Sequence, residues 1–219
     1  MAPPAATPLE APRMPAPAAG VAAPQPPRTL LIACGALARE VLALIALNGW
    51  SHMDVTCLPA KLHNTPARIP EAVRAKIRAG RRSHEQVVVL YGDCGTGGLL
   101  DRVIEEEGVE RIPGPHCYAF YRGVEAFLEE ADADPTCFYL TDYLVRHFER
   151  LVIKGLGLDR HPELLPDYFG NYTTLIYLAQ TTDPGLERKA KAAAVRLGLA
   201  YAQRSTGYGE LASFMHQAG

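Results

Sequence analysis

The most constraining feature of this chain is the stretch VVVLYGDCGTGG at residues 87–98. Its four leading aliphatic residues predict a strand that is buried on both faces, and such strands are typical of parallel sheets. The glycines that follow allow turns that other residues disfavour, and residues 99–107 then have a helical pattern. Cys94 therefore lies between the end of a strand and the start of a helix. The helix dipole stabilises a thiolate there, which makes Cys94 a better ligand or nucleophile.

Strand-like and helix-like segments alternate along the rest of the chain. Short apolar runs predict strands, and apolar residues at helical spacing predict helices. The expected strands are 29–33, 53–58, 87–90, 109–112, 137–140 and 173–179, and the expected helices include 36–48, 69–79, 99–107, 142–153 and 184–197. This alternation predicts an α/β fold with a Rossmann-like open sheet, mostly parallel, and helices on both faces. The residues from 208 onward are expected to add an edge strand or to fray.

Residues 1–28 differ from the rest of the chain in composition. They alternate Ala with Pro, and half of the 18 prolines fall there, which prevents a regular helix or sheet. We therefore expect a disordered Ala/Pro-rich tail over residues 1–28. A single α/β domain, with a more helical C-terminal part, is expected over residues 29–219.

Charge and cysteine content exclude several classes of protein. The net charge of -2 argues against a nucleic-acid partner held by bulk charge. A basic cluster at residues 74–82 is interpreted as a solvated helix face. No apolar run approaches the ~20 residues that a membrane-spanning helix needs. Five cysteines without dense spacing do not form a disulfide framework, so we expect a reducing, cytoplasmic location.

Three of the five cysteines directly follow expected strands. Cys34 follows the first strand, Cys94 follows the buried strand, and Cys117 follows the short strand through the turn PGPHC. Ligands of open parallel sheets bind at the carboxyl ends of the strands, so these thiols are expected to converge. Cys57 and Cys137 lie within apolar runs and are predicted to be small core residues.

The convergence of these thiols favours a metal or an iron–sulfur cluster. Zinc prefers tetrahedral sulfur and nitrogen ligands, and a cluster can use three cysteines with one open position. The predicted ligands are Cys34, Cys94 and Cys117, with His63 and His116 competing for the fourth position. The spacing contains no C-x-x-C pair, which is the usual local sign of such a site.

Two metal-free alternatives use the same residues. In the first, Cys94 is the nucleophile of a hydrolase-like elbow and a histidine is its acid–base partner. In the second, two cysteines face each other across a small carboxylate or amide substrate, as in cofactor-independent racemases. A third possibility is that the turn containing Gly92, Gly95 and Gly97 cradles the phosphate of a small-molecule ligand, although the Lys and Ser or Thr of a P-loop are missing. Tyr91 and Arg122 are expected to line a pocket near the cysteines.

Five segments in order, ACGALARE, LHNTP, YGDCGTGG, PGPHCYAFYRG and FYLTDYL, resemble the family known as domain of unknown function 1638. The resemblance covers about residues 30–199. Members carry a cysteine after the first strand, a histidine in an L-H-x-x-P loop, a Y-G-x-C-G turn, and then a histidine and a cysteine. Residue by residue, these features correspond to Cys34, His63, Cys94, His116 and Cys117. In many relatives an acidic residue separates the last two, which are adjacent here.

The resemblance also implies a biological setting. Genes of this family often lie beside corrinoid-dependent methyltransferases and their reactivation proteins, which implies one-carbon metabolism with corrinoid or methyltransferase proteins as partners. No D-x-H-x-x-G pattern for binding cobalamin occurs in this sequence, so an accessory role is expected. The function expected from the sequence is therefore a metal- or cluster-binding protein that serves methyl transfer, with a metal-free cysteine enzyme as the alternative.

Overall fold

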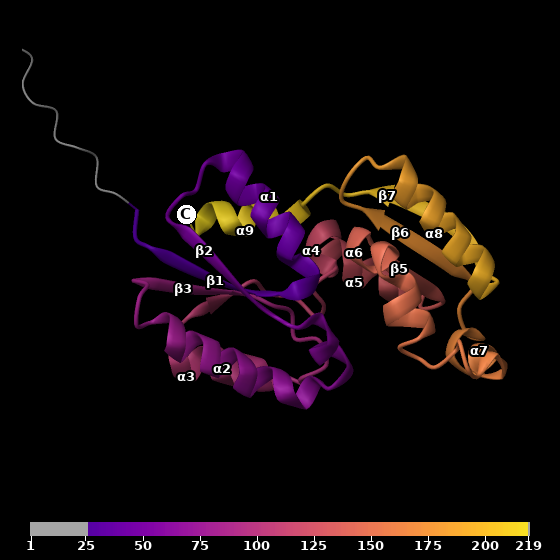
Figure 1. Cartoon of the computed structure of the whole chain (residues 1–219), viewed down its shortest axis with the longest axis horizontal. Coiled ribbons are helices and arrows are strands. Elements are labelled where there is room, and N and C mark those ends of the chain that lie inside the picture. Colours follow the sequence, from indigo (N-terminus) through magenta and orange to yellow (C-terminus); the bar gives the residue numbers. More distant parts are fainter. Residues whose placement is uncertain (1–25, 219) are drawn as a thin grey trace, which may run out of the picture.

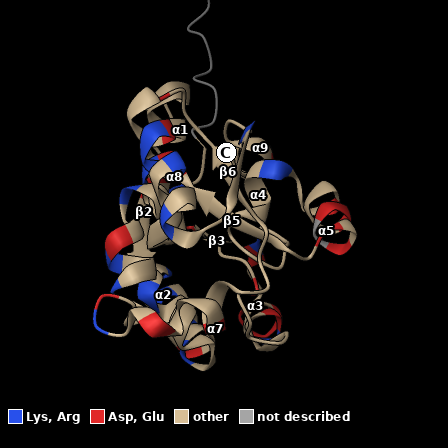
Figure 2. Cartoon of the chain, turned by 90° about the vertical axis from the view of Figure 1, so that its right-hand side faces the viewer, with Lys and Arg blue, Asp and Glu red and all other residues tan. Residues whose placement is uncertain are grey.

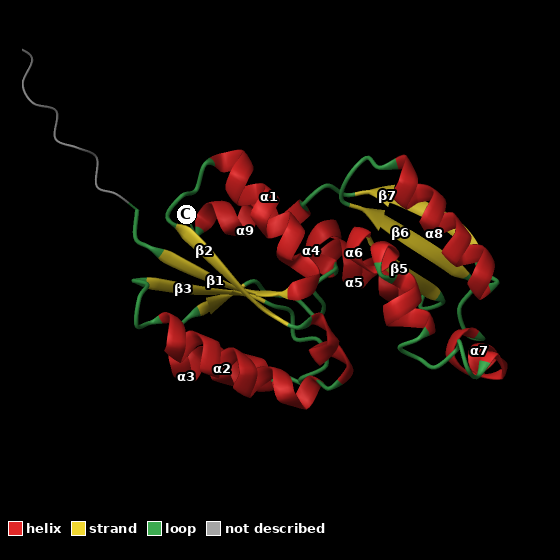
Figure 3. Ribbon diagram, in the orientation of Figure 1, coloured by secondary structure: helices red, strands yellow, loops and turns green. Residues whose placement is uncertain are grey.

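Two β-sheets, each made of parallel strands, form the framework of the computed structural model, which describes residues 26–218 (Figures 1 and 3). The first sheet has the order β2-β1-β3-β4 and the second has the order β5-β6-β7. The strands are β1 (Thr29–Cys34), β2 (Met53–Leu58), β3 (Gln86–Leu90), β4 (Glu110–Arg111), β5 (Cys137–Thr141), β6 (Thr174–Ala179) and β7 (Ala200–Ser205). The α/β class and the parallel pairing predicted from the sequence are confirmed, with the strands divided between two sheets.

The first sheet is buried because helices cover both of its faces. Its central strands β1 and β3 carry aliphatic side chains on both faces, and every residue of β1 is buried. In Figure 1, α1 (Ala38–Asn48) lies above this sheet, and α2 (Ile69–Gly80) and α3 (Leu99–Glu107) lie below it. Ala33 pairs with Leu90, so the loops after β1 and β3 leave the sheet at the same edge.

The second sheet has its own apolar core. Strand β6 is buried along almost its whole length and lies between β5 and β7. Helix α8 (Pro184–Leu197) supplies Leu186, Ala190 and Leu197 to this core. Asp183 caps the start of this helix, because its carboxylate accepts hydrogen bonds from the backbone N–H groups of Gly185 and Leu186. The remaining helices are α4 (Ala119–Arg122), α5 (Val124–Ala133), α6 (Asp142–Arg146) and α7 (Leu165–Phe169).

The last helix, α9 (Gly209–Gln217), returns to the first sheet. Leu211 and Met215 are fully buried in the first core, although they follow the strands of the second sheet in sequence. The prediction of an edge strand or a frayed end at this position is wrong. The apolar residues at 211 and 215 are four apart, which places them on one face of a helix.

The structure differs from the sequence-based expectations in three further respects. Strand β7 was not expected, because its sequence AYAQRS is polar and its residues are largely exposed at the sheet edge. The helix expected over 142–153 is interrupted: α6 ends at Arg146, and a π-helix covers Glu149–Ile153. Cys57 is exposed and Cys137 is half-buried, so neither is a core residue.

The described part of the chain contains no helix that is long and apolar enough to cross a membrane. Basic side chains gather on α2 and acidic ones on α3, which lie side by side (Figure 2). The expectation of a disordered tail concerns residues 1–28, of which 1–25 lie outside the described residues. Arg28 pairs with Asp54 of β2 at 2.9 Å and ties the start of the described chain to the first sheet.

Candidate functional site

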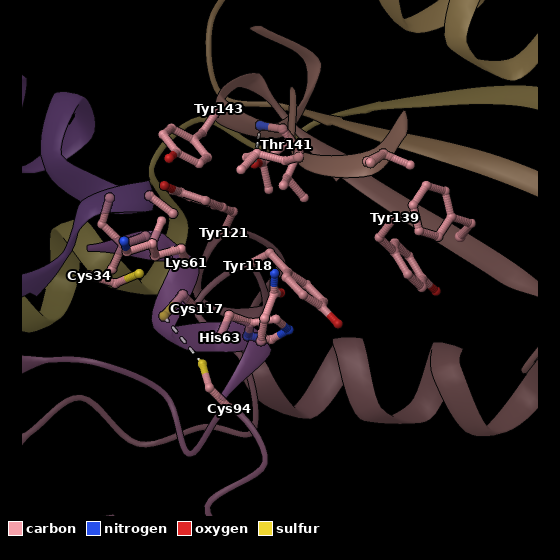
Figure 4. Close-up of a pocket in the computed structure, with 18 of the residues that line it drawn as sticks. Cys34, Lys61, His63, Cys94, Cys117, Tyr118, Tyr121, Tyr139, Thr141 and Tyr143 are labelled. Atoms are coloured by element: carbon pink, nitrogen blue, oxygen red, sulfur yellow. Dashed lines mark hydrogen bonds between the residues drawn. The ribbon is translucent and has the colours of Figure 1, made fainter. Parts of the chain in front are cut away.

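The fold brings together the three cysteines that follow strands of the first sheet (Figure 4). Cys34 is the last residue of β1, Cys94 lies in the loop after β3, and Cys117 lies in the loop after β4. All three are buried, and the Sγ atoms of Cys94 and Cys117 are 3.6 Å apart. Cys117 lies between the other two and interacts with both thiols.

Backbone contacts between two loops hold the Cys94–Cys117 pair. The Cys94 N–H donates to the Pro115 carbonyl at 2.7 Å, and the Asp93 N–H donates to the Gly114 carbonyl at 2.9 Å. Cys94 has a φ of 49°, a conformation that residues other than glycine rarely adopt. Such a conformation persists only where the surroundings fix it, and here it directs the thiol toward Cys117.

The glycines of this loop permit a close approach of two loops and backbone hydrogen bonds within the turn. A Cβ on Gly92 would lie 2.8 Å from the carbonyl carbon of His116, so glycine permits the close approach of the two loops. Asp93 accepts hydrogen bonds from the N–H groups of Gly97 at 3.1 Å and Gly98 at 2.9 Å. The N–H groups of Gly97 and Gly98, which would help to cradle a phosphate, are therefore already used within the loop.

Two imidazoles approach the thiols from different elements. His63 belongs to the short 3-10 helix Ala60–Asn64, and His116 directly precedes Cys117. Both interact with the Cys94 thiol, and their ring centroids are 6.2 Å apart. His63 is exposed, whereas Nδ1 of His116 is buried and has no hydrogen-bond partner among the described residues. All five predicted ligands therefore belong to one cluster around Cys94 and Cys117.

The pKa values of the three thiols shift in different directions, and the hydrogen bond from Cys117 lowers that of Cys34. The hydrogen bond from Cys117, together with those from His116 and His63, lowers the pKa of Cys94 to about 3. Hydrogen bonds to Cys34 and Cys94, together with burial, raise the pKa of Cys117 well above its usual value. The interaction with Cys94 raises the pKa of His63. These shifts favour the thiolate form of Cys94, the thiol form of Cys117 and the imidazolium form of His63.

The cluster forms one wall of a cavity of about 350 Å³ between the first sheet and strand β5, which we call the aromatic pocket. Thiols and Lys61 lie on one side of it, and Tyr139 of β5 lies on the other (Figure 4). Aromatic side chains dominate the lining, among them Tyr91, Tyr118, Tyr121, Tyr139, Tyr143 and Tyr172. Such a concave, mostly apolar cavity with a few polar groups is typical of a small-molecule site.

Sequence reasoning identified only the first-sheet side of this pocket. The prediction for Tyr91 is confirmed, whereas Arg122 does not line the pocket and pairs with Glu130 instead. The rings of the second-sheet side could not be assigned to the pocket from the sequence, because a strand sequence does not reveal which neighbour its side chains face. Cys137 also lines the pocket, which explains its partial exposure.

The geometry limits the chemistry of the cysteines. A separation of 3.6 Å is sulfur–sulfur contact, so no substrate carbon fits between Cys94 and Cys117 as a two-cysteine racemase requires. The N–H groups of Cys94, Gly97 and Gly98 donate within the loops, so they are not available as oxyanion donors of a hydrolase elbow. In the described residues, no three His, Cys, Asp or Glu side chains are arranged to hold a metal ion as they stand.

Comparison with known proteins gives one match. A family described as "Protein of unknown function (DUF1638)" matches residues 57–215. No curated protein and no solved structure matches the chain. The matched range includes His63, Cys94, His116 and Cys117, so the family shares the segments that form most of the cluster. Because the match extends over more than half of its residues, the chain belongs to the DUF1638 family of proteins of unknown function.

Proposed function

We propose that the chain binds a soft transition metal, zinc in the first place, through the thiols of Cys34, Cys94 and Cys117 and an imidazole. The observation that carries the proposal is the separation of 3.6 Å between the Sγ atoms of Cys94 and Cys117. Two thiolates bound to one zinc ion at about 2.3 Å in tetrahedral geometry are roughly 3.8 Å apart. The reduced pair is therefore spaced as two ligands of one ion.

The donor set supports the same proposal. Thiolates and imidazoles are the ligands that zinc prefers in proteins, and an iron–sulfur cluster also uses thiolates. The buried Nδ1 of His116, which has no partner among the described residues, is the kind of atom that a metal would satisfy. Cys94 and Cys117 form a ready pair, so the remaining ligands must come from Cys34, His63 and His116 by side-chain rotation.

A bound metal would supply Lewis acidity at the wall of the aromatic pocket. The pocket would then bring a small molecule to it, and Tyr118 would help to bury that molecule. The resemblance described above adds a setting: an accessory protein of corrinoid-dependent methyl transfer in the reducing cytoplasm. That setting remains part of the proposal.

Elemental analysis of protein purified without oxygen tests the proposal. We expect about one zinc per chain, or iron with sulfide if the site holds a cluster, and loss of the metal in Cys94→Ser and Cys117→Ser. Cys57→Ser is the matched control, because Cys57 is an exposed thiol outside the cluster. Wild-type protein that contains no metal and takes up neither zinc nor iron would overturn the proposal.

One observation favours a second candidate, a metal-free thiolate enzyme. The Cys94 thiol lies beside both imidazoles at the edge of the pocket, which is the arrangement of an activated cysteine. Iodoacetamide should then alkylate Cys94 selectively at neutral pH, at a rate that a chelator does not change. If the chelator greatly accelerates alkylation, a metal protects the thiol and the first candidate is favoured.

A further inference from the structure

The aromatic pocket continues into a second, more open cavity of about 630 Å³ on its Lys61 side, which we call the mouth. Lys61 and Tyr143 line both cavities, so the two form one cleft. The mouth adds Arg150, from the π-helix Glu149–Ile153, and the exposed Cys57. These side chains therefore lie next to the thiol-lined pocket, on its Lys61 side.

The cleft carries cationic side chains at its mouth and no carboxylate among its described lining residues. Among the described residues that line the two cavities, none is Asp or Glu, whereas Lys61 and Arg150 are cationic. Both side chains belong to exposed residues, and neither makes an ion pair with another described residue. Burial raises the pKa of the Tyr143 hydroxyl, and the charge of Arg150 opposes that rise, which places the guanidinium beside the pocket. Two free cations at the entrance of a cleft without carboxylates favour an anionic ligand.

The inner part of the cleft suits an aromatic body. The rings of Tyr118 and Tyr139 are nearly parallel, at 15° and with centroids 6.3 Å apart, and Phe127 packs edge-on against both. His116 stacks on Tyr118 at 5.0 Å, so the ring stack extends to the residue next to Cys117. A volume of about 350 Å³ is at the small end of the range for small-molecule sites.

We propose that this cleft binds a small aromatic carboxylate, with its ring among the tyrosines of the pocket and its carboxylate held by Lys61 and Arg150 at the mouth. Arg binds a carboxylate through two parallel N–H···O hydrogen bonds, and Lys adds a point charge. The inference rests on the proposed function for the chemistry that follows binding, and it names the class of ligand that would reach the thiols.

Titration calorimetry with simple probes tests this inference. The probes are phenylacetate, its neutral isostere phenylacetamide, and acetate, which lacks the ring. Each is titrated into the full-length wild-type protein and into Lys61→Gln, Arg150→Gln and Arg102→Gln. Arg102 is the matched control, because it is an exposed cation of α3 that lines neither cavity. Thermal unfolding midpoints show that each variant is folded.

We expect phenylacetate to bind at least tenfold more tightly than phenylacetamide or acetate. Lys61→Gln and Arg150→Gln should each weaken phenylacetate binding about tenfold, which is the effect of about 1.4 kcal/mol, and leave phenylacetamide unchanged. Arg102→Gln should bind all three probes like the wild type.

Three results would overturn the inference. The first is that phenylacetamide binds as tightly as phenylacetate, and the second is that phenylacetate does not bind at millimolar concentration. The third is that phenylacetate binds but is insensitive to Lys61→Gln and Arg150→Gln, which would mean that something other than these cations holds the carboxylate. The metal content of the same samples is measured separately. Metal without phenylacetate binding contradicts only this inference, and phenylacetate binding without metal contradicts only the proposed function.

Discussion

The carboxyl group of Glu40 is buried, which disfavours its charged form. It lies in the first turn of α1 with only 5% of its surface exposed, and its Oε2 has no hydrogen-bond partner among the described residues. Burial raises its pKa above the ordinary value of 4.5, and the nearby Asp142 carboxylate adds to the rise. The folded protein therefore holds this proton at pH values where the unfolded chain has lost it, so stability falls as the pH rises through this window.

Glu40→Gln should remove this penalty. We expect the variant to be more stable than the wild type at pH 8, because the neutral amide carries no charge for burial to penalise. The difference should disappear at pH 4, where both side chains are neutral. Urea unfolding at the two pH values measures it. A variant that is destabilised at pH 8 but not at pH 4 would show that Glu40 is charged and needed in the folded state.

The ligands of the candidate site could be identified from single residues, but their arrangement could not. Cys34, Cys94 and Cys117 share one position relative to their strands, and the rule that parallel strands end at a common edge brings them together. The positive φ of Cys94 and the close approach of the Gly92 loop to Cys117 depend on contacts between loops that are distant in sequence. For the same reason, the sequence did not show that Asp93 occupies the N–H groups of the glycine turn.

At the scale of elements, α2 and α3 are joined by one buried carboxylate. Glu107, near the end of α3, forms ion pairs with Arg74 at 3.2 Å, Arg78 at 2.8 Å and Arg81 at 3.3 Å. The basic cluster, interpreted from the sequence as a solvated face, is thus partly an interhelical contact. The arginines, Arg78 first, lower the pKa of Glu107. The stabilisation by these ion pairs is fully present at pH values above the ordinary pKa of glutamate. It is lost as the pH falls through the lowered pKa of Glu107.

Glu107→Gln should therefore lower the thermal unfolding midpoint by several degrees at pH 7, because three guanidinium groups lose their shared anion. The loss should shrink as the pH falls toward 3. Glu106→Gln is the matched control: its side chain is 59% exposed and pairs only with Arg74, so its effect should be small. Equal effects of the two substitutions would contradict the role assigned to Glu107.

The start of α9 depends on a glycine. Gly209 has a φ of +48°, and a Cβ there would lie 2.4 Å from the Tyr121 carbonyl oxygen. We expect Gly209→Ala to cost on the order of 1–3 kcal/mol of unfolding free energy by displacing α9 from α4. Gly207→Ala is the control, since Gly207 also has a positive φ but nothing lies within 4 Å of its Cβ position. If the two variants lose the same stability, backbone strain alone explains the effect.

The strands and helices of this fold could be predicted where the pattern of their own residues determines their structure. The aliphatic runs of β1, β3 and β6 and the capping residues of α8 lie within the elements they define. Strand β7 and helix α9 were missed because their structure depends on tertiary partners: β7 pairs along β6, and α9 buries Leu211 and Met215 in a core formed by the N-terminal half.

At the scale of the whole molecule, the aromatic pocket joins the two sheets. Its thiol side comes from the first core and its Phe138 and Phe169 side from the second. Division of the strands between two sheets could not be read from the alternation of strands and helices, because both arrangements have the same order of elements.

A metal held by residues from three loops should stabilise the fold as well as the site. Binding to the folded state alone adds about 2.7 kcal/mol when the free metal is at 100 times its dissociation constant. For a chain of this size, each kcal/mol shifts the unfolding midpoint by about 2–4 °C. We therefore expect a chelator to lower the midpoint of the wild type by several degrees and to leave that of Cys94→Ser unchanged. Equal shifts in both would place the metal elsewhere.

The most direct test of the proposed site is the X-ray absorption spectrum of the metal in protein purified without oxygen. For zinc, we predict at least two sulfur neighbours at about 2.3 Å and a nitrogen neighbour at about 2.0–2.1 Å. Replacing Cys117 by Ser should remove one sulfur or abolish binding. A spectrum with only oxygen and nitrogen neighbours, or a protein that binds no metal, would contradict the account.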